Sequence, residues 1–259
     1  MISRNSSLWL LLAFTAAIAL IAVLLPPIPQ PQSYHQFADQ RSFLGIPHFA
    51  DVTSNFPFAV VGIWGLIFVF RRGAPDTTFI DSRERWPYLL VFMGVFLTAF
   101  GSSYYHWSPS NARLVWDRLP MTIAFMAMVA AVIVERISLR LGLWLLPILL
   151  LVGLASVLQW YLSEERGQGD LRFYAGVQVY AALVLLLALL FPPRYTRGSD
   201  LAVIVGFYAL AKGLEMTDKP IFLLVHIVSG HTLKHLSAAM AAYWILRMLQ
   251  KRRPLSSPV

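Results

Sequence analysis

Three histidines, one aspartate and one serine give this sequence the residue types of a site for metal-assisted hydrolysis. Ser102 and His106 lie four residues apart towards the end of one strongly apolar segment, and Asp117 lies at the beginning of the next. His231 and His235, also four residues apart, lie in a third apolar segment. Ionisable side chains are costly to bury in a lipid bilayer, so this set predicts a functional site.

The chemistry that needs these residue types is hydrolysis at a zinc ion. Three imidazoles with an open fourth position are a common ligand set of catalytic zinc. Zinc held in this way lowers the pKa of a bound water to near ~7 and polarises a carbonyl group. A nearby carboxylate can orient that water and take its proton. A hydroxyl donor can stabilise the oxyanion that forms as the carbonyl carbon becomes tetrahedral.

Each member of the set also has a structural interpretation. His231 and His235 can be neutral side chains that hydrogen-bond between helices or face an aqueous vestibule. His106 beside a tryptophan can be an interfacial residue, and Asp117 beside an arginine can be an ion pair at a helix start. Ser102 can be a helix-packing hydroxyl. The combination favours the metal site, because the third histidine is followed by an aspartate at the start of the next apolar segment.

The composition is that of an all-α membrane protein. The 259 residues are 58% hydrophobic and 13% charged, and the mean hydropathy is +0.63. At about 20 residues per spanning helix, the chain has room for seven or eight spans. The net charge of +8 does not predict a nucleic-acid partner, because the basic residues cluster at the ends of apolar runs, where they set topology. The absence of cysteine excludes disulfides and thiolate ligands.

The apolar segments predict a polytopic bundle of eight transmembrane helices. The first segment, Leu8–Leu25, follows Arg4 as in a signal peptide, but prolines and no small-residue cleavage site come after it. We therefore expect an uncleaved span, with removal as the alternative. His226 lies off the helical face shared by His231 and His235, and we expect a structural role for it. Seven further segments have the approximate bounds Val52–Phe70, Pro87–Trp107, Val115–Val134, Leu141–Tyr161, Phe173–Phe191, Leu201–Met216 and Ile221–Leu249.

Lysine and arginine residues predict the orientation of these segments, because cytoplasmic loops carry the excess of basic residues. The most basic connections alternate along the chain, which places both termini in the cytoplasm. His106 and Asp117 then lie near the outer face. His231 lies about ten residues into the last predicted span, which is ~15 Å deep in a helix. We expect a multi-pass protein of the bacterial inner membrane with its site towards the outer half of the bilayer.

The stretches GSSYYHW, WDRLPM and SGHTLKHL resemble the motifs of the alkaline ceramidases. That family belongs to a superfamily of seven-span membrane hydrolases that includes adiponectin-type receptors and Per1-like lipid remodelling proteins. Its pattern is a serine and a histidine four apart on one span, an aspartate opening the next, and HxxxH on the last. The resemblance implies that zinc is bound by His106, His231 and His235. It also implies that Asp117 holds the catalytic water and that Ser102 helps to stabilise the oxyanion.

The resemblance covers about Tyr34–Leu249 and implies three parts of the chain. Residues 1–33 are expected to form one extra N-terminal span and a linker. Residues 34–250 are expected to form the seven-span hydrolase core, and residues 251–259 a basic cytoplasmic tail.

The segment before the core departs from the family pattern. The eukaryotic ceramidases carry acidic calcium ligands there, whereas this chain has only Asp39 and Asp51. Zinc is therefore the expected cofactor, and calcium is kept only as an alternative that would use Asp39. Asp51 and Asn55 are expected to cap and orient the first core helix.

Three further charges lie within apolar sequence. Lys212 and Glu215 are three residues apart, which predicts an ion pair within one helix, or side chains that line the substrate path. Lys234, between the two histidines of HxxxH, needs a carboxylate partner or a water-filled cavity.

These observations predict an integral-membrane zinc-dependent amidase of lipid metabolism. The expected reaction is hydrolysis of the N-acyl bond of a ceramide-like sphingolipid, giving a free fatty acid and a sphingoid-type amine. One alternative is a hydrolase of another N-acyl lipid. A second is a lipid receptor or sensor with a structural zinc, and a third is a haem- or proton-handling protein that uses the same histidines.

Overall fold

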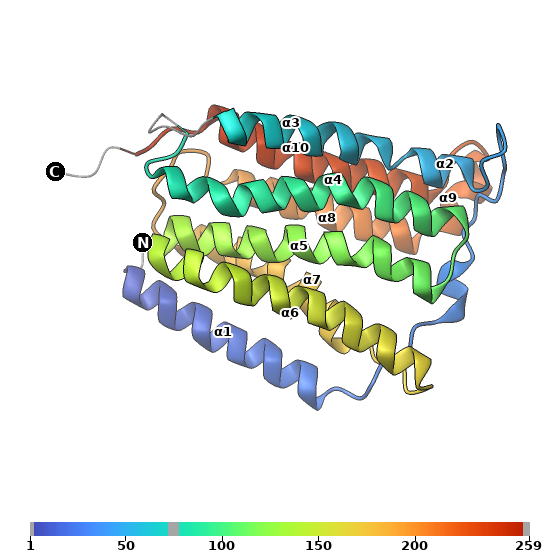
Figure 1. The fold of residues 1–259 in the computed structure, drawn as a ribbon, viewed down its shortest axis with the longest axis horizontal. Helices are drawn as coiled ribbons and strands as arrows, with labels where there is room; N and C mark the ends of the chain where they lie inside the picture. Colours follow the sequence, from blue (N-terminus) through green and yellow to red (C-terminus); the bar gives the residue numbers. More distant parts are fainter. Residues whose placement is uncertain (1–2, 72–77, 256–259) are drawn as a thin grey trace.

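The computed structural model describes residues 3–71 and 78–255, and within these ranges the chain is an all-α bundle without β-strands. Eight helices of 16 residues or more run along its long axis (Figure 1). They are α1 (Arg4–Leu24), α3 (Phe56–Arg71), α4 (Arg85–Trp107), α5 (Asn111–Arg136), α6 (Leu139–Glu165), α7 (Arg172–Leu187), α8 (Asp200–Met216) and α10 (Gly230–Lys251). The short helices are α2 (Phe49–Thr53), α9 (Asp218–Val225) and three 3₁₀ turns, η1 (Gln32–His35), η2 (Ser82–Glu84) and η3 (Ala188–Leu190).

Six helical segments in the described ranges are long and apolar enough to cross a membrane, so the chain is a multi-pass membrane protein. The segments are Arg4–Leu24, Phe49–Arg71, Ser82–Trp107, Asn111–Arg136, Leu139–Glu165 and Arg172–Leu190. The all-α prediction is confirmed. The other two predicted spans correspond to α8 and α10. They are not among the six, because α8 has only 17 residues and α10 begins with a polar turn.

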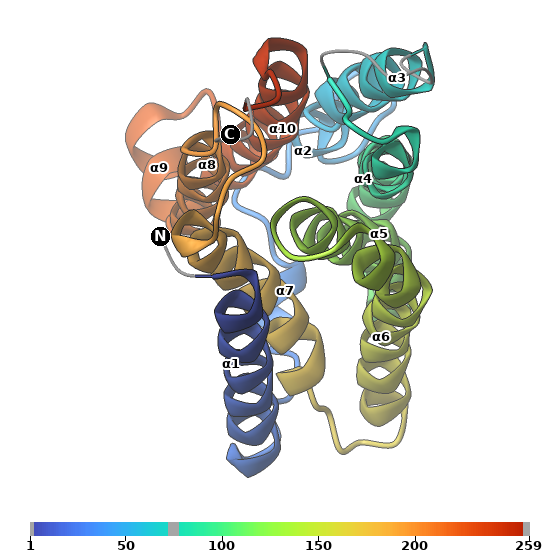
Figure 2. The ribbon, with the colours of Figure 1, turned by 90° about the vertical axis from the view of Figure 1, so that its left-hand side faces the viewer.

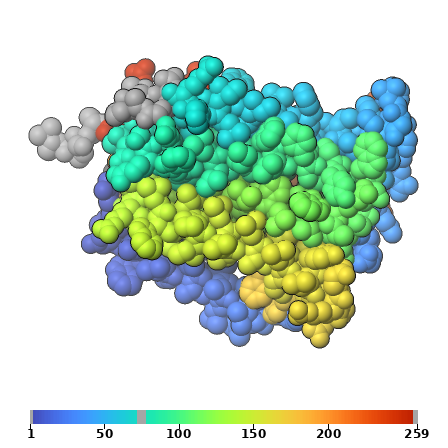
Figure 3. All heavy atoms as spheres, in the orientation of Figure 1, coloured from blue at the N-terminus to red at the C-terminus, as the bar shows by residue number. Residues whose placement is uncertain are grey.

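The long helices form two facing layers (Figure 2). One layer contains α3, α4, α5 and α6 in sequence order, each packed on the next. The other contains α10, α8, α7 and α1, and contacts of α10 with α3 and of α5 and α6 with α7 join the layers. Helix α6 lies on the outer face of the bundle that Figure 3 shows. Its large apolar side chains Trp144 and Leu151 are 71% and 65% exposed, as expected for a surface that faces lipid.

Helix α1 is held at the edge of the bundle mainly by α7. The hydroxyls of Thr15 and Tyr180 lie 2.9 Å apart. Arg172, whose guanidinium forms an ion pair with Asp170, also donates to the backbone carbonyls of Val23 and Leu25 at the end of α1. The N-terminal span is therefore tied to the bundle by polar contacts as well as by apolar packing.

Both termini lie at one end of the bundle, and α2 and α9 lie at the other (Figure 1). The predicted tail is described as far as Leu255, and residues 256–259 lie outside the described residues. Arg252 in this tail is only 3% exposed. Its guanidinium pairs with Glu135, donates to the Thr78 carbonyl and stacks on Tyr195, so the start of the tail folds into the bundle.

The predicted last span Ile221–Leu249 is wrong, because the chain breaks inside it. Helix α9 ends where His226 adopts a left-handed conformation with φ 57°, and α10 begins only at Gly230. Ser229 caps α10 by accepting the backbone N–H of Thr232. His231 therefore lies in the first turn of α10 and not ten residues inside a continuous helix.

Glycines allow α4 and α5 to approach closely beside the predicted site. A Cβ atom on Gly101 would lie 2.0 Å from the backbone oxygen of Trp116, and one on Gly94 would lie 2.7 Å from that of Pro120. Small residues permit such contacts between membrane helices. This approach places the C-terminal part of α4, which carries Ser102 and His106, against the part of α5 that carries Asp117.

Candidate metal centre and cavity

The three predicted histidine ligands converge in the folded chain. His106 lies in the last turn of α4, and His231 and His235 lie in the first two turns of α10. All three are buried, and one nitrogen from each lies within 4.8 Å of the others. The Nε2 atoms of His106 and His231 are 3.3 Å apart. This group can hold a metal ion.

The hydrogen bonding of the three rings fits a metal ligand set. The Nδ1 atom of His235 lies 2.8 Å from the Ser54 hydroxyl, whereas its Nε2 atom is buried without a hydrogen-bond partner. The Nε2 atoms of His106 and His231 face each other closely enough for both to contact one ion. Buried polar atoms are normally hydrogen-bonded, so atoms without partners point to a missing ligand. A metal ion would use the free lone pair of His235, and Ser54 would hold that ring in place.

Several contacts that sequence reasoning missed hold the histidine cluster in position. The His48 ring lies 2.9 Å from the carbonyl oxygen of His106, and the Asp218 carboxylate accepts the backbone N–H of His231 at 2.8 Å. The Phe37 ring packs against the rings of His106 and His231, at centroid distances of 4.6 and 4.5 Å. The loop between η1 and α2, which carries Phe37, thus covers the cluster. No local sequence pattern identified these partners, because His48 lies 58 residues from His106 and Asp218 lies 13 residues from His231.

Ser54→Ala is expected to weaken metal binding by roughly 10- to 100-fold, the usual cost of removing a group that orients a ligand. The His235 ring would keep its position in α10 but lose the hydrogen bond to the Ser54 hydroxyl that orients it. The measurement is competition for zinc against a chelator of known affinity. The matched control is Ser156→Ala, which removes another buried hydroxyl, bonded to a backbone carbonyl in α6. Equal affinities of the two variants would exclude a role for Ser54 at the site.

Ser102 and Asp117 also come together, beside the cluster. The Ser102 side chain is 2% exposed and lies close enough to the Asp117 carboxylate to interact with it. Both residues line the same cavity as His235. The metal-binding group itself contains histidines only. All five predicted residues therefore lie at one end of the bundle, with the hydroxyl and the carboxylate on the cavity wall.

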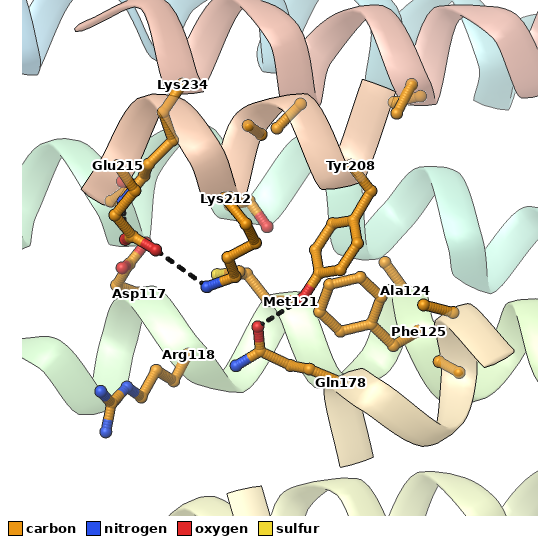
Figure 4. A pocket seen from close by; sticks show the side chains of 18 of the residues that line it. Asp117, Arg118, Met121, Ala124, Phe125, Gln178, Tyr208, Lys212, Glu215 and Lys234 are labelled. Carbon is orange, nitrogen blue, oxygen red and sulfur yellow. Dashed lines mark hydrogen bonds and ion pairs between the residues drawn. The ribbon is translucent and has the colours of Figure 1, made fainter. Parts of the chain in front are cut away.

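The cavity is large and mostly apolar. It has a volume of about 380 Å³ and extends between the two helix layers. Its apolar walls include Val95 of α4, Met121 and Phe125 of α5, Leu185 of α7, and Ala241 and Ile245 of α10. Its polar end is formed around Asp117 (Figure 4). A site with one polar end and long apolar walls suits an amphiphile with a hydrocarbon chain.

A charged network lies at this polar end. Glu215 accepts a hydrogen bond from Lys212 at 2.9 Å (Figure 4). It also accepts from Lys234 at 2.7 Å and from the Tyr34 hydroxyl at 3.0 Å. The predicted ion pair of Lys212 with Glu215 is confirmed, and both residues also line the cavity. Lys234 has the carboxylate partner that its position required. The network therefore joins α8, α10 and η1, which carries Tyr34, at the cavity wall.

The acidic residues before α3 do not fit a calcium site. Asp39 is 1% exposed, and Arg41 donates to both of its carboxylate oxygens. Burial acts to raise the pKa of Asp39, but the hydrogen bonds and charge of Arg41 outweigh it and leave that pKa below its ordinary value. Arg41 also donates to the carbonyls of His226 and Ile227. A guanidinium therefore supplies the positive charge at this carboxylate.

Asp51 and Asn55 have a different role from the predicted helix cap. The Asp51 carboxylate accepts from the Thr232 hydroxyl at 2.7 Å and from the Ser229 hydroxyl at 3.3 Å. The Asn55 side chain donates to the backbone carbonyl of Asp51. The bonds of the Asp51 carboxylate fasten α2 to the N-terminal end of α10, which carries His231 and His235. His226 is exposed and lies outside the histidine group.

Comparison with known proteins adds no family to this description. No protein-family model matches the chain, and no curated protein matches it significantly. Its class therefore rests on fold and site. It is a multi-pass, all-helical membrane protein with three buried histidines that can hold a metal ion.

Proposed function

We propose that this protein is a zinc-dependent amidase that hydrolyses the N-acyl bond of ceramide-like lipids. The observation that carries the proposal is the convergence of three buried histidines beside a largely apolar cavity whose wall includes Ser102 and Asp117. The resemblance of the same residues to the alkaline ceramidase motifs supports the substrate class. The products would be a free fatty acid and a sphingoid-type amine.

The residues of the chain would divide the reaction between them. Zinc bound by the histidines would supply a Lewis acid and lower the pKa of water. Asp117 would take a proton from the water that adds to the N-acyl carbonyl carbon, and would return it to the amine nitrogen as the carbon–nitrogen bond breaks. Ser102, which lies beside Asp117 on the cavity wall, would donate its hydroxyl to the oxygen on which negative charge develops.

The same proposal includes a location and an orientation. Arg4, Arg83, Arg140 and Arg194 line one surface pocket, at the end of the bundle where both termini lie. A concentration of arginine at that end supports a cytoplasmic location for it under the positive-inside rule. The histidines would then lie towards the outer half of a bacterial inner membrane, where the substrate enters from lipid.

Metal analysis combined with a hydrolysis assay tests the function. The purified protein in detergent is incubated with N-acyl lipids that differ in head group and acyl length, and released fatty acid is measured. We expect about one zinc per chain and release from at least one ceramide-like lipid. Stoichiometric zinc without release from any lipid would favour the receptor alternative. A haem absorption spectrum would overturn both.

A further inference from the structure

Arg118 is a buried cation on the wall of the cavity without a carboxylate partner. Its side chain lines the cavity, and the residue is 4% exposed. Its Nη2 atom donates to the side-chain oxygen of Gln30 at 2.6 Å, whereas its Nη1 atom is buried without a partner. In the described ranges no ion pair joins Arg118 to an acidic residue. Gln30 is neutral and leaves the charge uncompensated.

Aromatic rings surround the guanidinium but do not neutralise it. The centre of the guanidinium lies 4.0 Å from the ring centroid of Trp160, 4.4 Å from that of Tyr174 and 5.7 Å from that of Tyr34. A cation–π contact is weaker than the cost of burying an unpaired ion, and it supplies no negative charge. The indole N–H of Trp160 is also buried without an acceptor. The unpartnered Nη1 atom of Arg118, whose side chain lines the cavity, indicates that an acceptor is missing there.

The charged side chains along the cavity wall also leave an excess of positive charge. Three cations line it, Arg118, Lys212 and Lys234, against two carboxylates, Asp117 and Glu215. Glu215 is shared by the two lysines. One positive charge therefore remains in excess, and an anionic group would balance it.

The position of Arg118 relates this charge to the reacting bond. Asp117 and Arg118 are consecutive residues of α5, and both line the same cavity (Figure 4). A lipid whose amide lies beside Asp117 would place its acyl chain along the apolar walls. Its head group, which is separated from the amide by only a few bonds, would then be within reach of Arg118.

We propose that Arg118 makes the cavity selective for N-acyl lipids whose head group is anionic, such as a phosphate. This inference rests on the proposed amidase function and names its substrate class. The planar guanidinium has free donors for a phosphate oxygen, and hydrogen bonds to charged groups are stronger than those to neutral ones. The anion would complete the hydrogen bonding of Nη1 and neutralise the excess charge.

The test compares a ceramide with the same ceramide carrying a phosphate monoester, both in neutral detergent. For the wild-type protein we expect kcat/KM to be at least about tenfold higher for the phosphorylated ceramide than for the ceramide, as for a charge-assisted hydrogen bond. We also expect the phosphorylated ceramide to raise the melting temperature of the protein more than the ceramide does. Arg118→Gln is expected to lower the ratio of the two kcat/KM values by roughly 10- to 100-fold, as for a lost charge-assisted hydrogen bond. Arg118→Lys, which keeps the charge, is expected to give an intermediate ratio.

Controls separate recognition from structure. Arg113→Gln removes another stacked arginine of α5, which lies 4.6 Å from the Tyr104 ring and does not line the cavity, and we expect it to keep the wild-type ratio. If Arg118→Gln lowers both kcat/KM values in the same proportion, Arg118 is structural and the proposal fails. If inorganic phosphate alone raises the melting temperature as much as the phosphorylated lipid, the site binds a free anion and not a head group.

The two proposals can fail separately. Selective stabilisation by the phosphorylated lipid that depends on Arg118, without hydrolysis of any lipid, would overturn the amidase but support the anion site. Hydrolysis at equal rates for both lipids would support the amidase and overturn the anion site. If neither Arg118 variant folds, wild-type binding decides, because equal stabilisation by the two lipids contradicts the inference.

Discussion

Asp117→Asn is expected to reduce fatty-acid release by about 10²- to 10⁴-fold, the usual contribution of a general base, while leaving the zinc content unchanged. Asparagine has nearly the same size and can still accept a hydrogen bond from Ser102, so the cavity wall keeps its shape. It cannot accept the proton of the attacking water. The measurement is release from the best lipid substrate, together with metal analysis of the same preparation.

Glu165→Gln is the matched control for this variant. Glu165 is exposed at the end of α6 and does not line the cavity, so neutralising it tests for a general effect of lost negative charge. We expect wild-type release from this control. Activity of Asp117→Asn within a few-fold of the wild type would contradict the role of Asp117 as the base, even if the protein proves to be an amidase.

His231→Ala is expected to remove both the metal and the turnover. It deletes one of three ligands, so the loss of metal affinity should exceed the roughly 10- to 100-fold cost of losing a supporting residue such as Ser54. The Nε2 atom of His231 faces that of His106, and the substitution leaves His106 without this neighbour. Metal content and fatty-acid release should therefore fall together, and excess zinc should restore neither fully.

His226→Asn controls for the loss of a histidine near the same helix. His226 is exposed and ends α9 in a left-handed conformation, which asparagine tolerates. We expect this variant to bind zinc and release fatty acid as the wild type does. Full zinc content in His231→Ala would show that the histidine cluster is not the metal site.

The pair of variants distinguishes an enzyme from a receptor with structural zinc. In an enzyme, Asp117→Asn separates metal binding from turnover, whereas His231→Ala abolishes both. In a receptor, neither variant has turnover to lose, and Asp117→Asn changes only lipid binding. The contrast depends on Asp117 lining the cavity without belonging to the histidine group.

The sequence by itself determined the class of fold and the residues of the candidate site. Long apolar runs require helices in a bilayer, because only there are all backbone groups bonded within the segment. The spacing of His231 and His235 places both on one helical face, because four residues are close to one turn. The pairing of Lys212 with Glu215 follows from the same local geometry.

Only the tertiary structure decided what these residues meet. The break between α9 and α10 escaped prediction because apolar residues continue through it, and the left-handed His226 and the Ser229 cap became evident only in the backbone. Ser54 joins His235 from 181 residues away, and Arg118 meets Gln30 from 88 residues away. Such partners are set by the packing of helices and not by periodicity within one helix. Local spacing therefore identified the candidate ligands, whereas the packing of the two layers brought them together and formed the cavity beside them.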